Sequence, residues 1–250
     1  MLGETTRSTR TVRPLKPNGS PQTFEMGFAF DSFGRMKSMV YPDGEKLTYH
    51  YDAGGLVARA TGTRPATKHY QAQTETYLTS LTYDEFEQRK TLIYGNAGTS
   101  VYTYDPLTRR LKNLDTTVAG RRLQRLTYAY DLVGNVTGLT NALGQPTTGY
   151  ATGPQSGAVS YAYSYDKLYR LTSASGRAYA RPGVVDSFAS SFQYDDIHNM
   201  KANVQVHTIS SLNSQGTGAG QAKPTQSNHD WGYAYDPAHP HRALKIGETL

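Results

Sequence analysis

The sequence predicts an all-β protein, a curled strip of repeated antiparallel β-hairpins, and three observations support that prediction. A short motif that ends in Asp recurs along the chain, first at Asp31 and again at Asp52. Tyrosine is abundant, with 20 Tyr against 7 Phe and 1 Trp, while hydrophobic residues make up only 37%. Because a Tyr ring packs its face and keeps its hydroxyl hydrated, this composition suits sheets with one wet face. Helical periodicity of useful length is absent.

The repeated motif is an aromatic residue, any residue, a second aromatic residue and then Asp. Two residues that are two apart lie on the same face of a strand, so each copy ends a half-buried strand with paired rings. The first copy is Phe28, Phe30 and Asp31, and in a later copy Leu81 replaces the first ring. In the seven copies after the first, we assign the second ring and its Asp as structural repeat residues. They are Tyr51, Asp52, Tyr83, Asp84, Tyr104, Asp105, Tyr130, Asp131, Tyr165, Asp166, Tyr194, Asp195, Tyr235 and Asp236.

Each copy is predicted to run strand, tight loop, strand. The Asp carboxylate can accept backbone N–H groups two residues further on, which favours a turn. Gly34, Gly55 and Gly134 follow three residues after their Asp, where a hairpin loop requires a positive φ. The apolar pattern then resumes. Four copies carry another residue at the glycine position, which leaves the loop type there open but not the repeat: Glu87, Thr108, Tyr169 and His198.

The loops at the other end of the hairpins differ in length. In the first copy Tyr41-Pro42-Asp43-Gly44 separates residues 36–40 from residues 47–51, a turn in which Pro presets φ and Gly supplies freedom. Intervals between repeat Asp residues that exceed the minimum of 21 predict insertions at this end. The largest, rich in Ser, Gly, Gln and Asn, predicts a mobile loop over residues 208–230. Residues 1–23 predict a flexible basic leader, and residues 24–250 an array of about eight copies.

The repeats resemble the Rhs or YD-repeat family, whose pattern is aromatic-x-Tyr-Asp-x-x-Gly-Arg-Leu. Residues 102–111, 128–135 and 235–241 also resemble bacterial members. The two most similar stretches are Phe28-Ala29-Phe30-Asp31-Ser32-Phe33-Gly34-Arg35-Met36 and Tyr163-Ser164-Tyr165-Asp166-Lys167-Leu168-Tyr169-Arg170-Leu171.

The resemblance implies that the strip forms part of a hollow shell. In this family, Rhs toxins and the B and C components of insecticidal toxin complexes use the shell to enclose a C-terminal toxin, and teneurins use it in adhesion. Sheet physics independently favours curling, because twisted open sheets rarely exceed ~10 strands without it and eight hairpins supply about 16. The family's autoproteolytic aspartyl site has no match after Asp236.

Charge and composition exclude several classes of protein. The net charge of +6 is small for 250 residues, and the chain has no Cys, so it forms no disulfide or thiolate metal site. No stretch reaches the ~20 apolar residues of a membrane span, and no secretory signal is seen. We therefore expect a secreted or cell-surface protein that is exported by a non-classical route.

Catalytic and ligand-binding alternatives are weaker than structural ones. The chain has no nucleophile elbow, phosphate-binding loop or zinc-protease motif. Turn chemistry explains the repeated Asp residues, and a solvated loop explains the pair Asp195-Asp196. His239 and His241 lie two apart, as metal ligands can, but Pro237 and Pro240 favour a rigid turn.

The most basic segment offers a choice between a nucleic-acid or anionic-glycan site and the charged outer face of one hairpin, and we favour the charged face. Only Asp115 opposes its basic residues, which are Arg109, Arg110, Lys112, Arg121, Arg122 and Arg125.

The sequence thus predicts a non-enzymatic shell or scaffold segment of a bacterial toxin-delivery or polymorphic-toxin system, with no cofactor and no metal. Its expected partners are further repeat segments or a toxin cargo, and nucleic acid is disfavoured. The alternative is a cell-surface or carbohydrate-binding repeat module that uses the Tyr-rich face to bind glycans.

Overall fold

The computed structural model describes residues 3–13, 19–69, 71–143, 158–181, 183–211, 223–224 and 227–247. Clustering of the backbone divides the chain into two compact units. Unit 1 comprises Met1–Tyr102 with Thr117–Arg121, and unit 2 comprises Thr103–Thr116 with Arg122–Leu250. The described residues include no helix that could cross a membrane.

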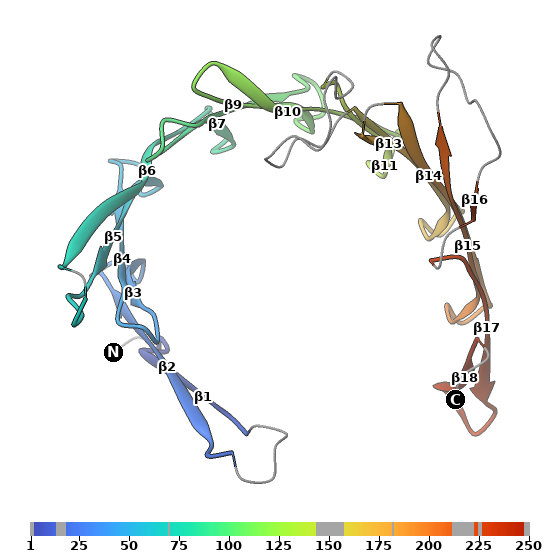
Figure 1. The fold of residues 1–250 in the computed structure, drawn as a ribbon, viewed down its shortest axis with the longest axis horizontal. Helices are drawn as coiled ribbons and strands as arrows, with labels where there is room; N and C mark the ends of the chain where they lie inside the picture. The colour runs from blue at the N-terminus through green and yellow to red at the C-terminus, as the bar shows by residue number, and fades with distance from the viewer. Residues whose placement is uncertain are drawn as a thin grey trace. The chain divides into compact units, whose positions relative to one another are not determined.

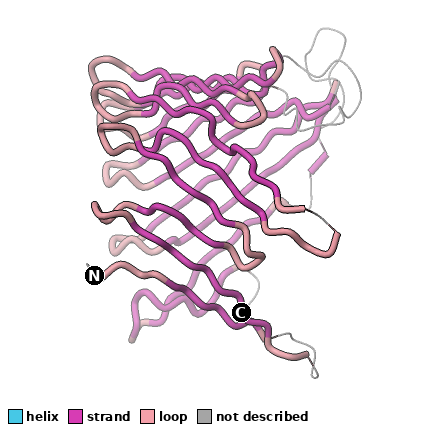
Figure 2. Tube along the Cα trace, turned by 90° about the vertical axis from the view of Figure 1, so that its left-hand side faces the viewer, coloured by secondary structure: helices cyan, strands magenta, loops and turns pink. Residues whose placement is uncertain are grey.

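Unit 1 is a meander in which each strand pairs antiparallel with its neighbour in the chain (Figures 1 and 2). The last two residues of its final strand belong to unit 2. Its strands are β1 (Arg7–Val12), β2 (Gln22–Phe30), β3 (Met36–Val40), β4 (Lys46–Tyr51), β5 (Val57–Arg64), β6 (Gln73–Tyr83), β7 (Arg89–Tyr94) and β8 (Thr99–Tyr104).

Unit 2 continues the same antiparallel pattern, with β15 pairing with both β16 and β17. The hairpin turn between its first two strands belongs to unit 1. Its strands are β9 (Leu111–Val118), β10 (Arg121–Tyr130), β11 (Val136–Asn141), β12 (Val159–Tyr165), β13 (Leu171–Arg181), β14 (Val184–Tyr194), β15 (Met200–Ser211), β16 (Lys223–Pro224), β17 (His229–Asp236) and β18 (His239–Ile246).

The predicted all-β class with repeated antiparallel hairpins is confirmed, and within each unit successive strands follow a bent path (Figure 1). The register slips by one residue next to most Asp loops, for example between Ala29 and Phe30 and between Gln193 and Tyr194. Such a bulge increases the local twist of a strand pair, so its repetition favours curvature within a unit.

Few side chains are fully buried. Among the described residues the buried hydrophobic side chains are Ala60, Leu92, Ala174 and Val185, and most of the remaining buried ones are Ser, Thr or Asn. A sheet that packs a second layer would bury large aliphatic residues along one face of every strand. Cohesion within each unit therefore depends on the strand ladders, on cross-strand pairs and on contacts between neighbouring loops.

The leader prediction is wrong for residues 7–12, which form β1. Val12 is the one apolar residue of this strand, which pairs with residues 22–27 of β2 through the backbone. Arg7 also forms an ion pair with Glu25, and the Thr11 and Thr23 hydroxyls are 3.0 Å apart. Polar cross-strand pairs of this kind stabilise a strand that has no hydrophobic pattern to reveal it.

Strands extend into both ends of the predicted mobile loop over residues 208–230. Residues 208–211 continue β15, residues 223–224 form β16, and residues 229–230 start β17. The other part of the predicted loop, apart from residues 227–228, lies outside the described residues.

Candidate functional site

The repeated Asp residues sit at the start of tight loops, most of which share one geometry. In the first loop the Asp31 N–H donates to the Arg35 carbonyl over 2.9 Å, and the Gly34 N–H donates to the Asp31 carbonyl over 3.1 Å. The Asp31 Oδ1 atom accepts the N–H groups of Phe33 and Arg35 at 2.9 and 3.0 Å. Asp84, Asp166 and Asp195 repeat all these contacts at the equivalent residues. The carboxylate thus closes the loop that follows each strand.

The residue three after Asp adopts a left-handed backbone. Gly34, Gly55 and Gly134 have φ values of 73°, 87° and 108°, as the sequence predicts. The sequence left the loop type open where other residues stand at this position, and the structure shows the same loop at three of them. Those residues take positive φ themselves and are Glu87 (59°), Tyr169 (61°) and His198 (70°).

The loop at Asp105 is one residue longer, which corrects the assignment of Thr108 to the left-handed position. Arg109 takes that conformation, with φ of 58°, and the Asp105 N–H reaches the Arg110 carbonyl over 2.8 Å. Thr108 instead donates its N–H and its hydroxyl to Asp105 Oδ1 at 2.7 and 2.9 Å. An extra backbone residue is accommodated because the Thr side chain supplies an additional donor to the carboxylate.

The second carboxylate oxygen binds the side chain four residues further on. Asp31 Oδ2 and Asp166 Oδ2 each accept from Nε of an Arg at 2.7 Å, from Arg35 and Arg170 respectively. The equivalent donors to Asp131 and Asp195 are the amide groups of Asn135 and Asn199, at 2.8 and 2.9 Å.

These contacts lower the pKa of the loop carboxyls. Desolvation opposes ionisation of Asp31, Asp131, Asp166 and Asp195, but the hydrogen bonds from the backbone and from the residue four further on outweigh it, so each pKa lies below its usual value. In Asp105 and Asp236 the backbone N–H groups of Thr108 and Ala238 are the main cause of the lowered pKa. The loops are therefore built around charged carboxylates.

The last residue of an Asp loop, four after Asp or five after it in the longer loop at Asp105, also reaches the next loop along the strip. Arg110 Nη1 donates to the Asp131 carbonyl at 2.8 Å, and Arg170 Nη1 donates to the Asp195 carbonyl at 3.0 Å. Asn199 donates to the Pro240 carbonyl at 2.8 Å. Each of these side chains therefore joins its own loop to its neighbour.

Tyrosine hydroxyls make a second set of links between repeats. In six copies the Tyr that precedes the Asp donates its hydroxyl to a carbonyl just after the previous Asp loop, at 2.7 to 3.0 Å. The acceptor is five residues after the previous Asp in five copies and six after it at Leu111, where the loop is one residue longer. Partial burial raises the pKa of four of these hydroxyls, those of Tyr83, Tyr130, Tyr194 and Tyr235, so they remain donors at neutral pH. The six pairs are Tyr51 with Met36, Tyr83 with Val57, Tyr130 with Leu111, Tyr165 with Val136, Tyr194 with Leu171, and Tyr235 with Met200.

Guanidinium groups stack on the same rings. The Arg35 Cζ atom lies 4.3 Å from the centroid of the Tyr51 ring, and the Arg170 Cζ atom lies 4.8 Å from that of Tyr194. A cation over an aromatic face contributes about 0.5–1 kcal/mol at exposed sites. At these two loops the carboxylate, the guanidinium and the Tyr ring of the next repeat therefore lie in contact one after another.

Sequence reasoning placed Tyr and Asp at the loops but missed the links between them. One signal was present. The second ring of the motif is Tyr in all copies except the first, where it is Phe30, whereas the first position accepts Phe, Tyr or Leu. A position that requires a hydroxyl is one where the hydroxyl makes a contact.

The His and Arg residues considered above as metal or anion ligands form hydrogen bonds or ion pairs within the protein. His239 Nδ1 lies 3.1 Å from Asp236 Oδ2, and His241 Nδ1 lies 2.8 Å from Asn199 Oδ1. In the described part of the chain, no three His, Cys, Asp or Glu side chains gather as metal ligands would. In the basic segment, Arg122 Nε donates to Asp115 Oδ1 at 3.0 Å and Arg125 Nε lies 3.9 Å from Asp115 Oδ2.

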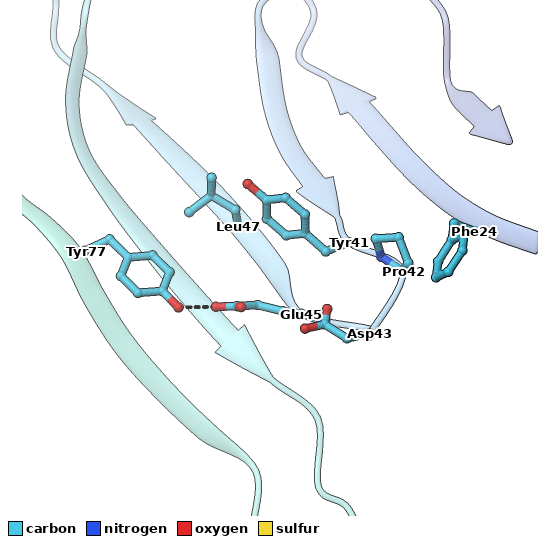
Figure 3. Close-up of a pocket in the computed structure, with 7 residues that line it drawn as sticks. All are labelled: Phe24, Tyr41, Pro42, Asp43, Glu45, Leu47 and Tyr77. Atoms are coloured by element: carbon cyan, nitrogen blue, oxygen red, sulfur yellow. Dashed lines mark hydrogen bonds between the residues drawn. The ribbon is translucent and has the colours of Figure 1, made fainter. Parts of the chain in front are cut away.

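A groove of about 690 Å³ lies beside the turn between β3 and β4 in unit 1 (Figure 3). The Tyr77 hydroxyl donates to Glu45 Oε1 across it. Gly62 makes room for this contact, because a Cβ atom there would lie 2.4 Å from the Tyr77 ring. The groove combines half-exposed rings with two carboxylates, and its lining is Phe24, Tyr41, Pro42, Asp43, Glu45, Leu47 and Tyr77.

Fold and loops together define a protein of aromatic–Asp hairpin repeats, in which side chains join each loop to the next. Comparison with known proteins agrees with this class. The RHS repeat family model matches residues 30–67. Toxin subunit YenC2 of Yersinia entomophaga is 38% identical over 159 residues, which is 61% of this chain and 16% of that protein. Toxin subunit YenC1 of the same organism is 35% identical over 114 residues, 43% of this chain and 11% of its own length. The chain therefore contains an RHS repeat over residues 30–67 and is similar to toxin subunits over a larger part of its length.

Solved structures share the fold. A crystal structure of TcdB2-TccC3-Cdc42 matches with a TM-score of 0.65 and 21% identity over 90% of this chain and 10% of the matched chain. The Tc holotoxin pore of Photorhabdus luminescens matches with a TM-score of 0.59 and 18% identity, over 86% of this chain and 13% of the other. The chain therefore spans a sixth or less of the length of these relatives.

Proposed function

We propose that this chain is a non-enzymatic shell or scaffold segment of a bacterial toxin-delivery system. The observation that carries the proposal is the use of the repeated polar side chains: each loop carboxylate closes its own turn, and six Tyr hydroxyls join neighbouring repeats. Residues engaged in this way supply mechanical continuity to a strip. Similarity to two toxin subunits supports the toxin context.

The proposed partners are further repeat segments and a toxin cargo. Because few hydrophobic side chains are buried within the described residues, the strip has apolar surface left to cover. Covering it with more repeats, or with an enclosed protein, lowers that exposure. We further propose that the assembly acts outside the producing cell, after export by a route that needs no classical signal.

The test is the fate of a cargo. The natural protein that contains this chain, purified with the toxin encoded in the same frame or in an adjoining one, should protect that toxin from proteinase K until the repeats are unfolded. A toxin that is digested at the same rate with and without the repeat segment would contradict the shell function. Genes next to this one that encode neither toxin nor further repeats would also contradict it.

A second candidate function, glycan binding, is favoured by one observation, the groove in Figure 3. Half-exposed rings such as Tyr41 and Tyr77 can stack on sugar rings, and the carboxylates of Asp43 and Glu45 can accept hydroxyl hydrogen bonds. A glycan array followed by calorimetry tests it. Tyr41→Ala should abolish binding, whereas Trp231→Ala, an equally exposed aromatic residue of unit 2, should not. Equal loss in both variants, or no binding by the unaltered chain, would rule out the groove as a glycan site.

A further inference from the structure

The tips of the Asp loops carry exposed apolar side chains in a regular series. In unit 2 the residue two after Asp is Leu107, Val133, Leu168 or Ile197, with exposures of 91%, 57%, 57% and 47%. Leu132, one residue earlier, is 99% exposed. We call these five residues, together with Tyr169, the loop-tip row. Unit 1 has the same feature by itself, in Phe33 and Phe86 at 80% and 58% exposure.

Such residues are unexpected at solvated turns. The central positions of turns favour Gly, Asn, Asp, Ser and Pro, and the opposite edge of unit 1 follows that rule with Pro42-Asp43 and Asn96. Scattered exposed hydrophobic residues need no explanation, but a repeated apolar series along one edge marks an interaction surface.

The loops also hold these side chains in fixed positions. Asp105, Asp131, Asp166 and Asp195 each accept, through Oδ1, the N–H of the residue that carries the exposed side chain, at 3.1, 3.1, 2.8 and 3.0 Å. The loop backbone is thus ordered before any partner binds. Docking onto the row then costs little conformational entropy.

The spacing and area of the row indicate what covers it. Asp loops recur every second strand, which at ~4.8 Å per strand places neighbouring tips roughly 10 Å apart. A second strip of the same repeat has that spacing. The six apolar side chains of the row are 47% to 99% exposed, so together they can supply much of the ~800 Å² per partner of a standard interface.

We propose that the loop-tip row is an interaction surface that packs against the loop edge of a second strip of the same hairpin repeat, supplied in solution by a second copy of this chain. The inference rests on the proposed scaffold function, because lateral packing of strips is what a scaffold requires. It adds the residues that make the contact.

The experiment measures association of the 250-residue chain by sedimentation velocity across micromolar concentrations. The triple variant Leu107→Asp, Leu132→Asp, Leu168→Asp should weaken self-association by about tenfold or more, since it places charges at the centre of the contact. The matched triple variant to Met should associate like the unaltered chain. Circular dichroism should show unchanged strand content in both variants, because all three residues are exposed loop tips.

A separate variant distinguishes the row from an open sheet edge. β18 pairs with β17 and exposes Leu244 and Ile246, so self-association through that edge is the competing explanation. If Leu244→Asp with Ile246→Asp disperses the chain and the loop-tip variant does not, the proposal is overturned. A chain that is monomeric at all concentrations also overturns it. These outcomes leave the cargo-protection test of the shell function unaffected, so the two ideas fail separately.

A photoreactive residue at position 132 gives the contact directly. Under the proposal it cross-links to an Asp loop of the second copy, and the mass of the cross-linked peptides identifies which one. Cross-links to β18, or only within one chain, would contradict the proposed surface.

Discussion

The two edges of the strands differ in how strictly they repeat. On the Asp edge, loops in both units reuse one geometry even where Glu87 or His198 must adopt a left-handed backbone to do so. On the opposite edge the turns at Tyr41 and Tyr94 have the same backbone hydrogen bonds as the Asp loops, but the other connections differ in length. Ala119 and Gly120 form a two-residue turn, whereas the connection from Arg64 to Gln73 is much longer. The difference follows from what each edge contacts.

Loops on the Asp edge are joined to one another by side chains. Arg170, for example, binds the carboxylate of its own loop and the Asp195 carbonyl of the next, so a change in one loop disturbs two. The strands at the other edge are held mainly by backbone pairing, which tolerates insertions in the connecting loops. The uniform loops of the Asp edge therefore mark where repeats depend on one another. The opposite, variable edge is where a specific groove can form.

Acid should cause the largest loss of unfolding free energy, because it protonates the carboxylates of all Asp loops at once. Six loop carboxyls have pKa values below the usual one, so their contribution is present above the unfolded-state pKa of about 3.9 and is lost as pH falls through the folded-state values. Denaturant titrations should give a level unfolding free energy down to about pH 5 and a steep fall below about pH 4.

The loop carboxylates themselves supply the control for the acid experiment. Asp166→Asn with Asp195→Asn should lower stability at neutral pH and flatten the fall in acid, because two of the titrating groups are gone. A stability that stays constant between pH 5 and pH 2 would show that the loop charges do not hold the Asp edge together.

On the variable edge, one steric clash should lower the unfolding free energy more than the loss of any single link on the Asp edge. A Cβ atom at Gly95 would lie 1.5 Å from the Thr76 carbonyl oxygen, and the Gly95 N–H donates to the Tyr77 carbonyl over 3.0 Å. Gly95→Ala must displace backbone, so we expect a loss of about 3 kcal/mol in unfolding free energy. Gly232→Ala, where a Cβ meets nothing within 4 Å, is the control and should be close to neutral. Similar stabilities for the two variants would contradict this steric account.

The tyrosine links on the Asp edge should each contribute less. Tyr194→Phe removes the hydroxyl that donates to the Leu171 carbonyl at 3.0 Å, and Tyr165→Phe removes the equivalent bond to Val136. Each should cost about 1 kcal/mol in unfolding free energy. Tyr128→Phe is the matched control, since Phe28 and Phe192 occupy the same motif position in other copies. A control that costs as much as Tyr194→Phe would mean that the second motif position has no special need for a hydroxyl.

The strands and Asp loops were predictable because their signals are local. The spacing of Tyr163, Tyr165 and Asp166 fixes both the face of the strand and the start of the turn within a few residues. The links between repeats were not predictable in the same way. Tyr235 contacts the carbonyl of Met200, 35 residues away, and that pairing depends on strand register and on the length of the intervening loop.

The errors have the same origin. β1 was missed because its residues are mostly polar and its partner supplies the pairing, and the place of Arg109 was missed because one added residue in a loop leaves no trace in composition. Leu107 and Leu168 can be read in the sequence, but only the structure shows that their side chains are exposed at the loop tips.

The smallest expected effect tests why the Asp edge keeps its geometry even with unfavourable residues. Glu87 is exposed and holds φ at 59°, a conformation that costs a non-glycine residue roughly 1–2 kcal/mol, while Gly55 at the equivalent position avoids that cost. Glu87→Gly should therefore raise the unfolding free energy by about 0.5–1 kcal/mol, the steric relief being offset in part by the greater freedom of Gly in the unfolded chain. The reverse change, Gly55→Ala, should lower it by a similar amount. Thermal or urea unfolding measures both. If Glu87→Gly destabilises the protein instead, the Glu87 side chain contributes more to the unfolding free energy than its left-handed backbone costs. The repeated loop geometry would then depend on side-chain contacts at the left-handed position as well as on those of Asp and Tyr.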